Sequence, residues 1–198
     1  YRGNNFGKVT WVKNYIGALS PDHEYYRNQS KKTDGNIYLK ASYDLTGGLS
    51  AYADLQYRYI SYKIEGDNDK WDWTADPGHL QRLNVNEDFS FFNPKAGLFW
   101  QFNPNHSAYA SFAVAQKEPT RNNYTDGLFD ELPRPEKMLD YELGYTFRNS
   151  RFTAGVNLYY MDYTDQLVLN GKVNDIGEAM AENVKDSYRM GIELSLGA

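Results

Sequence analysis

Strict alternation of apolar and polar side chains between residues 152 and 161 constrains this chain more than any other feature. The even positions are Phe152, Ala154, Val156, Leu158 and Tyr160, and the odd positions are Thr153, Gly155, Asn157, Tyr159 and Met161. A period of two predicts an extended strand, because successive side chains of a strand point to opposite faces. The alternation recurs at 37–45, 49–59, 94–102, 108–114, 141–147 and 188–196, and more weakly at 6–16. No segment of comparable length has a helical stripe, so the sequence predicts an all-β protein.

Short and long connections alternate between these predicted strands. The short ones, Thr46-Gly47-Gly48, Asn103-Pro104-Asn105 and Asn149-Ser150, have tight-turn compositions and predict antiparallel hairpins. Polar stretches at 17–35, 64–91, 117–138 and 164–186 separate the hairpins, and we expect them to be long loops. Tight turns at one end and long loops at the other are typical of outer-membrane barrels, whereas a soluble β-sandwich usually has short turns at both ends.

The two faces of the predicted strands differ in chemistry. Opposite the apolar face lie Lys40, Asp44, Asp54, Arg58, Glu142, Arg189 and Glu193, together with Gly144, Gly155 and Gly191. A sandwich buries its apolar face between sheets, whereas a transmembrane barrel turns that face to lipid and its polar face to the lumen. Alternation alone does not separate these folds, but the loop asymmetry and the inner-face chemistry favour an antiparallel up-and-down transmembrane barrel. Aromatics near strand ends, Trp100, Tyr159, Tyr160 and Tyr163, are expected to form its interfacial girdles.

Composition excludes several functions. The net charge of -5 argues against a nucleic-acid partner, and the absence of cysteine excludes a thiolate metal site and a cysteine nucleophile. The three histidines, His23, His79 and His106, lack metal-ligand spacing, so we expect no metal site and no cofactor. The carboxylates show no catalytic spacing beside a nucleophile or base, so we do not expect an enzyme. Both chain ends suggest a piece of a longer protein, because residues 1–8 lack a starting methionine and the chain closes within an alternating run.

Three segments resemble the β-barrel domain of TonB-dependent outer-membrane receptors. They read FFNPKAGLFWQFNPNHSAYASFAVAQKEPTRNNYTDG (91–127), PEKMLDYELGYTFRNSRFTAGVNLYYMDYTDQLVL (135–169) and ENVKDSYRMGIELSLGA (182–198). The resemblance implies that residues 1–198 form several hairpins of a 22-stranded barrel in the outer membrane of a Gram-negative bacterium, with the plug domain and the final strands absent. It implies TonB-energised uptake of a scarce nutrient such as a ferric siderophore, with haem, cobalamin and glycans as other cargoes. The implied partners are outer-membrane lipid, the N-terminal plug of the parent chain and the TonB complex, reached through a TonB box that this chain lacks.

Five residues of the expected external loops are candidates for cargo binding. Trp71 and Trp73 could stack on an aromatic or sugar group, and Arg82 could pair with an anionic ligand. Arg121 and Tyr124 could face a ligand pocket, although a Glu118–Arg121 ion pair that only fixes the loop is the simpler interpretation. The stretch 65–73, EGDNDKWDW, fails as a calcium loop because Trp71 stands where an oxygen ligand is needed. It is expected to be a solvated external loop.

Two other functions stay open at this point. One is a passive porin without a plug, which the parent sequence upstream of Tyr1 would distinguish. The other is a soluble β-sandwich that binds carbohydrate through Trp71, Trp73 and Tyr124.

Overall fold

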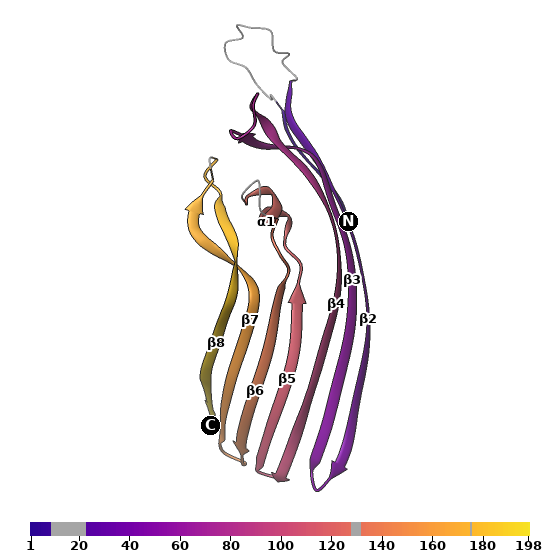
Figure 1. The fold of residues 1–198 in the computed structure, drawn as a ribbon. Coiled ribbons are helices and arrows are strands. Elements are labelled where there is room, and N and C mark those ends of the chain that lie inside the picture. The colour runs from indigo at the N-terminus through magenta and orange to yellow at the C-terminus, as the bar shows by residue number, and fades with distance from the viewer. Residues whose placement is uncertain (9–22, 128–131, 175) are drawn as a thin grey trace.

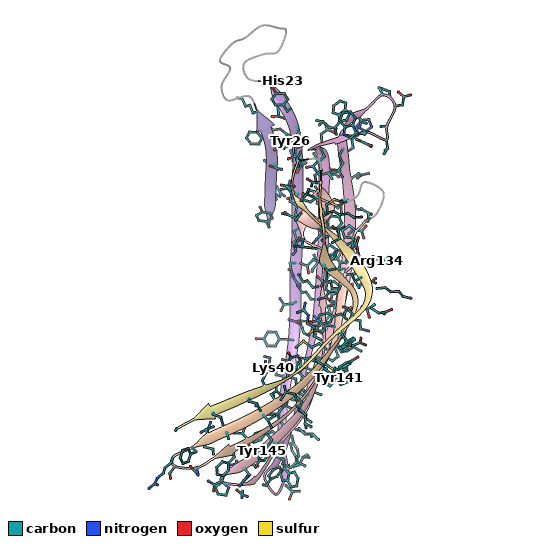
Figure 2. All side chains as sticks on the ribbon, turned by 90° about the vertical axis from the view of Figure 1, so that its left-hand side faces the viewer. His23, Tyr26, Lys40, Arg134, Tyr141 and Tyr145 are labelled. Carbon is teal, nitrogen blue, oxygen red and sulfur yellow. The ribbon has the colours of Figure 1, made fainter. Side chains whose placement is uncertain are left out.

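The computed structural model describes residues 1–8, 23–127, 132–174 and 176–198, and these form one antiparallel sheet of eight strands (Figure 1). Each strand pairs with the next in the chain, so the order is β1-β2-β3-β4-β5-β6-β7-β8. The elements are β1 (Arg2–Lys8), β2 (Glu24–Thr46), β3 (Leu49–Asp72), β4 (His79–Asn103), β5 (His106–Lys117), α1 (Arg121–Thr125), β6 (Glu136–Arg148), β7 (Thr153–Val173) and β8 (Ala179–Gly197). Seen from the side, the sheet is curved, as the wall of a barrel must be (Figure 2). Among the described residues, no helix has the length and apolarity needed to span a membrane.

The three predicted tight turns are confirmed, and all lie at one end of the sheet (Figure 1). The β2–β3 turn needs glycine, since Gly47 and Gly48 have φ angles of 57° and 79°. At the other two turns an asparagine side chain accepts hydrogen bonds from the backbone two or three residues ahead. Asn103 accepts one from the Asn105 amide at 2.9 Å, and Asn149 accepts one from the Phe152 amide at 2.7 Å.

The expectation of four long loops at the opposite end is wrong in extent. Most of 64–91 lies in β3 and β4, which are joined by residues 73–78 alone, and most of 164–186 lies in β7 and β8. Strand β2 already begins at Glu24, and residues 17–22 lie outside the described part of the chain. From β2 onwards, the β5–β6 connection, 118–135, is the one long connection between the described strands. The polar stretches are therefore mainly strand extensions.

An inversion of the alternation explains this error. On β3 the apolar residues occupy odd positions up to Tyr59 and then even positions, Ile60, Tyr62 and Ile64. On β4 the apolar residues occupy odd positions between Leu83 and Phe91 and even positions from Phe92 onwards, so this strand shows the same shift. Since Ile60 pairs with Phe89 and Ile64 with Val85, the inverted positions of both strands share the inner face of the sheet. After residue 59 of β3 and before residue 92 of β4, the apolar residues therefore lie on the inner face of the sheet and are buried. In the rest of both strands the apolar residues lie on the outer face.

The half of the sheet nearest the three tight turns, here called the lower part, carries a broad apolar band on its outer face. Leu143 and Ile192, which a sandwich would bury, are 53% and 68% exposed. Aromatic rings border the band at both ends. Towards the turns these are Trp100, Phe102, Tyr145 and Phe147, and towards the loops Tyr57, Tyr59, Phe92, Phe112, Tyr141, Tyr160 and Tyr188. Phe102 and Phe92 are about 33 Å apart along β4, which at a tilt of roughly 40° gives the about 25 Å band of a transmembrane barrel.

The inner face of this part pairs tyrosines with glycines across neighbouring strands. Tyr52 pairs with Gly97, Tyr109 with Gly144 and Tyr159 with Gly191. A Cβ on Gly144 would lie 2.0 Å from the Tyr109 ring, so the glycine provides the space that the ring occupies. The girdle prediction is therefore wrong for two residues. Tyr159 covers Gly191 and Tyr163 stacks beneath Arg189, both on the inner face, because odd positions of β7 point inward. Trp100 and Tyr160 lie on the outer face as predicted.

Replacing Gly144 with alanine should destabilise the wall. The new methyl group would displace the Tyr109 ring, whose hydroxyl lies within hydrogen-bond distance of two acceptors, Asn157 Oδ1 at 2.9 Å and Glu142 Oε2 at 3.2 Å. We expect the Gly144→Ala substitution to lower the free energy of unfolding by about 1–3 kcal/mol, measured by denaturant unfolding of the full-length protein in detergent micelles. Gly35→Ala is the matched control, because no atom lies within 4 Å of its Cβ position. Equal unfolding midpoints for the two variants would contradict this account.

Candidate functional site at the loop end of the sheet

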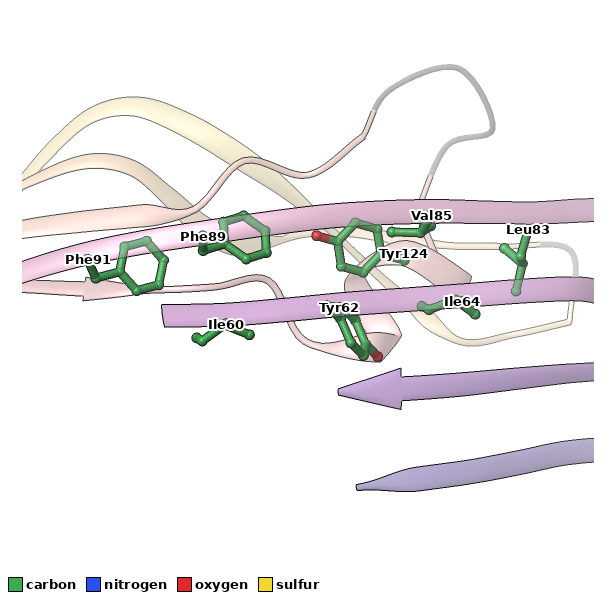
Figure 3. Close-up of a cluster of buried hydrophobic side chains, with 8 residues drawn as sticks. All are labelled: Ile60, Tyr62, Ile64, Leu83, Val85, Phe89, Phe91 and Tyr124. Atoms are coloured by element: carbon green, nitrogen blue, oxygen red, sulfur yellow. The ribbon is translucent and has the colours of Figure 1, made fainter. Parts of the chain in front are cut away.

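The long β5–β6 connection folds inward over the sheet. Its residues 118–127, here called the inward loop, include α1, from which the buried Tyr124 reaches the apolar inner face of β3 and β4. The rings of Tyr124 and Tyr62 lie 5.8 Å apart. Ile60, Ile64, Leu83, Val85, Phe89 and Phe91 complete the cluster (Figure 3). The inverted stretches of β3 and β4 are apolar because this loop covers them.

Glu118 anchors the start of the inward loop. Its carboxylate, only 11% exposed, accepts hydrogen bonds from the Lys32 ammonium and from Arg58 Nη1, the latter at 3.0 Å. Arg58 also donates to both oxygens of Asp34, with Nε–Oδ1 at 3.0 Å and Nη2–Oδ2 at 2.5 Å. Burial alone would raise the pKa of Glu118, but the hydrogen bond from Lys32 and the charge of Arg58 outweigh it and hold that pKa below its usual value.

A second anchor holds the end of the inward loop. Lys70 is 1% exposed, and its ammonium donates to the Thr125 carbonyl and to Asp126 Oδ1, the latter at 3.2 Å. The Asn68 amide donates to the same carbonyl at 3.0 Å and to Gln81 Oε1 at 2.8 Å. Lys70 and Asn68 come from the end of β3, just before its connection to β4. A buried ammonium with a carboxylate and a carbonyl as partners fixes the position of α1 on β3.

One polar group in this cluster is unsatisfied. The Tyr124 hydroxyl is buried without a hydrogen-bond partner among the described residues. Burial of the phenol raises the pKa of Tyr124, so the hydroxyl stays protonated. A buried unpaired hydroxyl costs about 1–3 kcal/mol.

The inward loop also borders a polar hollow beside the β7–β8 hairpin. The hollow has a volume of about 380 Å3 and is lined by Asn123, Gly127, Leu132, Pro133, Arg134, Leu167, Asn170, Met180, Ala181, Glu182 and Asn183. Arg134 closes one side by donating to Asp165 Oδ1, with Nη2–Oδ1 at 2.7 Å, and the Asn183 amide donates to the Asp165 carbonyl at 2.6 Å. At the tip of this hairpin, a hydrogen bond with Asp126 raises the pKa of Glu178.

The five predicted cargo residues do not form one site. Trp71 and Trp73 contact each other, with ring centroids 6.0 Å apart, and Trp73, the first residue of the β3–β4 connection, is 77% exposed. Arg82 is exposed on the outer face, Arg121 donates to the Asn28 side chain, and Tyr124 is buried. Among the described residues, no hydrogen bond, ion pair or ring contact joins the two tryptophans to Arg121 or Tyr124.

Two expectations about individual residues need correction. Glu118 pairs with Lys32 and Arg58 rather than with Arg121. The stretch 65–73 is mostly the end of β3, and it directs Asn68 and Lys70 inward instead of forming a solvated loop. Sequence reasoning missed Lys32, Asn68 and Lys70. The inverted alternation at 60–64 and 83–91 was the signal that could have indicated a covered inner face there.

The geometry defines a class of protein: a curved antiparallel barrel wall with an apolar outer band, a polar inner face and an external loop folded inward. Within the described residues, no group of three or more His, Cys, Asp or Glu side chains could hold a metal ion. A family model described as "TonB dependent receptor-like, beta-barrel" matches residues 1–198, so the chain belongs to the TonB-dependent receptor β-barrel family.

Solved structures agree on the fold. The FrpB iron transporter from Neisseria meningitidis is similar with a TM-score of 0.60 and 19% identity, over 86% of this chain and 24% of that chain. The ferric-catecholate import receptor Fiu from E. coli K12 has a TM-score of 0.63 and 16% identity, over 98% of this chain and 30% of that chain. The copper transporter OprC has a TM-score of 0.63 and 14% identity, over 88% of this chain and 27% of that chain. The chain thus spans about a quarter of the first of these structures. A comparison with curated proteins finds no match.

Neutralising Glu118 should release the inward loop. In the Glu118→Gln variant, Lys32 and Arg58 lose their shared carboxylate, which we expect to weaken the anchor by about 1–3 kcal/mol. Amide hydrogen exchange of residues 120–126 in the full-length receptor should then be roughly ten- to hundredfold faster. Glu136→Gln is the control, because its partner Lys117 is exposed and the pair, 3.5 Å apart, contributes little. Unchanged protection in Glu118→Gln would refute the anchoring role.

Acidification should have the same effect as that substitution. Because the folded-state pKa of Glu118 lies below the ordinary value of 4.5, the carboxylate stabilises the docked loop fully above that pH. The stabilisation is lost as the pH falls through the folded-state pKa. A spin label on Asn122→Cys, in a chain without native cysteine, should be immobile at pH 7 and become mobile only below about pH 4.5. Combined with Glu118→Gln, the label should already be mobile at pH 7. A label that is equally immobile at pH 7 with and without Glu118→Gln would exclude this mechanism.

Proposed function

We propose that this chain is a segment of the barrel domain of a TonB-dependent receptor that imports a scarce nutrient, such as a ferric siderophore, across the outer membrane of a Gram-negative bacterium. The observation that carries the proposal is the inversion of polarity along β3 and β4. Their outer face is apolar up to Tyr59 and Phe92 and polar beyond them, and their inner face changes in the opposite sense. A wall that passes from lipid into water on its outside requires this pattern.

The upper inner surface is where we place the cargo. Its centre is the polar hollow beside the inward loop. Trp71, Trp73 and Arg82 lie at the far end of the β3–β4 hairpin, where they could make first contact with an arriving cargo. Iron, ferric-catecholate and copper transporters share this fold, which supports a metal-containing cargo as a class.

The lower inner surface is where we place the plug of the parent chain. Charged side chains such as Asp54, Glu142, Arg189 and Glu193 stand on this face among the tyrosine–glycine pairs. A plug bearing the TonB box would pair with them. The presence of that plug would also distinguish a TonB-dependent receptor from a passive porin. The sandwich alternative lacks support, because the described strands form a single sheet with its apolar face exposed. The role is binding and transport, without bond-making chemistry.

Uptake by the full-length receptor tests this function. Cells that depend on the receptor should accumulate radiolabelled ferric siderophore only with an intact TonB complex, and a protonophore should abolish the accumulation. Trp73→Ala should weaken cargo binding about tenfold, since it removes an exposed stacking surface. Trp100→Phe in the lipid-facing girdle should leave binding unchanged.

Cysteine labelling in the same cells checks the orientation independently of the cargo. An impermeant maleimide should label Trp73→Cys on intact cells and Ser150→Cys only after permeabilisation, because the two positions lie at opposite ends of the sheet (Figure 1). Labelling of Ser150→Cys on intact cells would invert the proposed topology. Uptake that is independent of TonB would favour the porin.

A further inference from the structure

A row of three cations crosses the outer face above the apolar band. The strand register places Arg2 of β1 opposite Lys31 of β2, and Lys31 opposite Lys63 of β3. All three side chains are exposed and, by the alternation of their strands, share the face that carries the lipid-facing residues lower down. Directly opposed residues have Cβ atoms about 5 Å apart, so the three charges lie within about 10 Å.

This row departs from the charge pairing of the rest of the sheet. Elsewhere opposite charges face each other across strands, as Lys40 and Asp54 do at 3.2 Å and Lys117 and Glu136 at 3.5 Å. Like charges placed directly opposite destabilise a sheet. Among the described residues, the ion pairs include none with Arg2, Lys31 or Lys63. In a chain with a net charge of -5, three unneutralised cations in a row indicate an anionic ligand.

The surroundings of the row form a shallow hollow with hydrogen-bonding groups. Its volume is about 450 Å3, and it is lined by Arg2, Gly3, Asn4, Gln29, Ser30, Lys31, Lys63 and Glu65. The amide side chains of Asn4 and Gln29 lie on the same face, one row further from the band. Two carboxylates flank the row: Glu65 beside Gln29, and Asp88, which accepts a hydrogen bond from Tyr59 at 3.2 Å. The three cations therefore have two carboxylates near them, and one of these, Asp88, already accepts the hydrogen bond from Tyr59.

The height of the row selects the ligand. Lys63 lies four residues beyond Tyr59, where the outer aromatic girdle ends, which is about 13 Å along the strand and about 10 Å above the apolar band at the tilt of a barrel wall. Lysine and arginine side chains extend towards a nearby membrane interface and bind anionic headgroups there. We propose that Arg2, Lys31 and Lys63 bind the phosphate groups of an anionic lipid in the outer leaflet. This site rests on the proposed placement of the band in a bilayer, and it is separate from the cargo surface on the opposite face.

The test is native mass spectrometry of the full-length receptor titrated with bis-phosphorylated lipid A. The wild-type receptor should retain lipid A, whereas Lys31→Gln/Lys63→Gln should bind it about thirtyfold more weakly, since each cation near a membrane surface contributes about fivefold. Lys31→Arg/Lys63→Arg should keep the affinity. Lys172→Gln, which removes an exposed lysine at the β7–β8 tip, should match the wild type.

Three results would overturn the proposal. They are equal lipid A affinity of the Gln variant and the wild type, equal binding of lipid A from which the phosphates have been removed, and complete competition by millimolar inorganic phosphate, which would make the site one for a free anion. Insertion of the receptor into lipid nanodiscs is the separate check on the barrel itself. If the receptor inserts but fails the lipid A test, the site is refuted and the proposed function stands. If the receptor does not insert, the proposed placement of the apolar band in a bilayer is wrong, and the lipid site that rests on it is refuted as well.

Discussion

The change of solvent along the length of the strands governs this structure. In a bilayer every backbone donor and acceptor must be paired within the protein, so strands that cross it must be hydrogen-bonded along their whole length. Here the β2–β3 and β3–β4 ladders continue well past the last outward-facing aromatic residue. Beyond Tyr59 the outer face meets water and the inner face meets the inward loop, so the same strand is amphipathic in opposite senses at its two ends. The inversion falls at matching positions on β3 and β4, because Tyr59 pairs with Ser90 and Ile60 with Phe89.

The two kinds of contact that hold the inward loop contribute differently. The cluster around Tyr124 supplies apolar burial, which is attractive but non-directional. The anchors at Glu118 and Lys70 add little net free energy, because each buried charge must first be desolvated. They fix the position instead, since a shift of the loop would leave Lys70 without its carboxylate and Glu118 without its cations. Burial therefore explains why the loop folds inward, and the ion pairs explain where it stops.

Sequence reasoning predicted the part of the fold that alternates in one phase and missed the part where the phase changes. The seven strand cores and the three tight turns needed only a period of two and the turn compositions at residues 46–48, 103–105 and 149–150. The extensions were mistaken for loops because the apolar residues of 64–91 lie in the inverted phase and do not continue the alternation of the strand cores at 49–59 and 94–102. The anchors of the inward loop could not be predicted at all. Glu118 lies 86 residues from Lys32 and 60 from Arg58, and nothing local specifies such pairs.

The arrangement also determines which part of the wall can change when a ligand binds. A ligand shifts a conformational equilibrium only to the extent that it binds one state better. Each strand is joined to its neighbours in the sheet by ladders of backbone hydrogen bonds, whereas the described contacts between β3 and the inward loop are made by β3 side chains, namely Arg58, Asn68, Lys70 and those of the apolar cluster. Displacing the loop breaks far fewer backbone hydrogen bonds than moving a strand. It would uncover Lys32 and Arg58 on the inner face without disturbing the apolar band outside. Any response to a cargo in this segment is therefore expected in the loop, while the lipid-facing wall stays fixed.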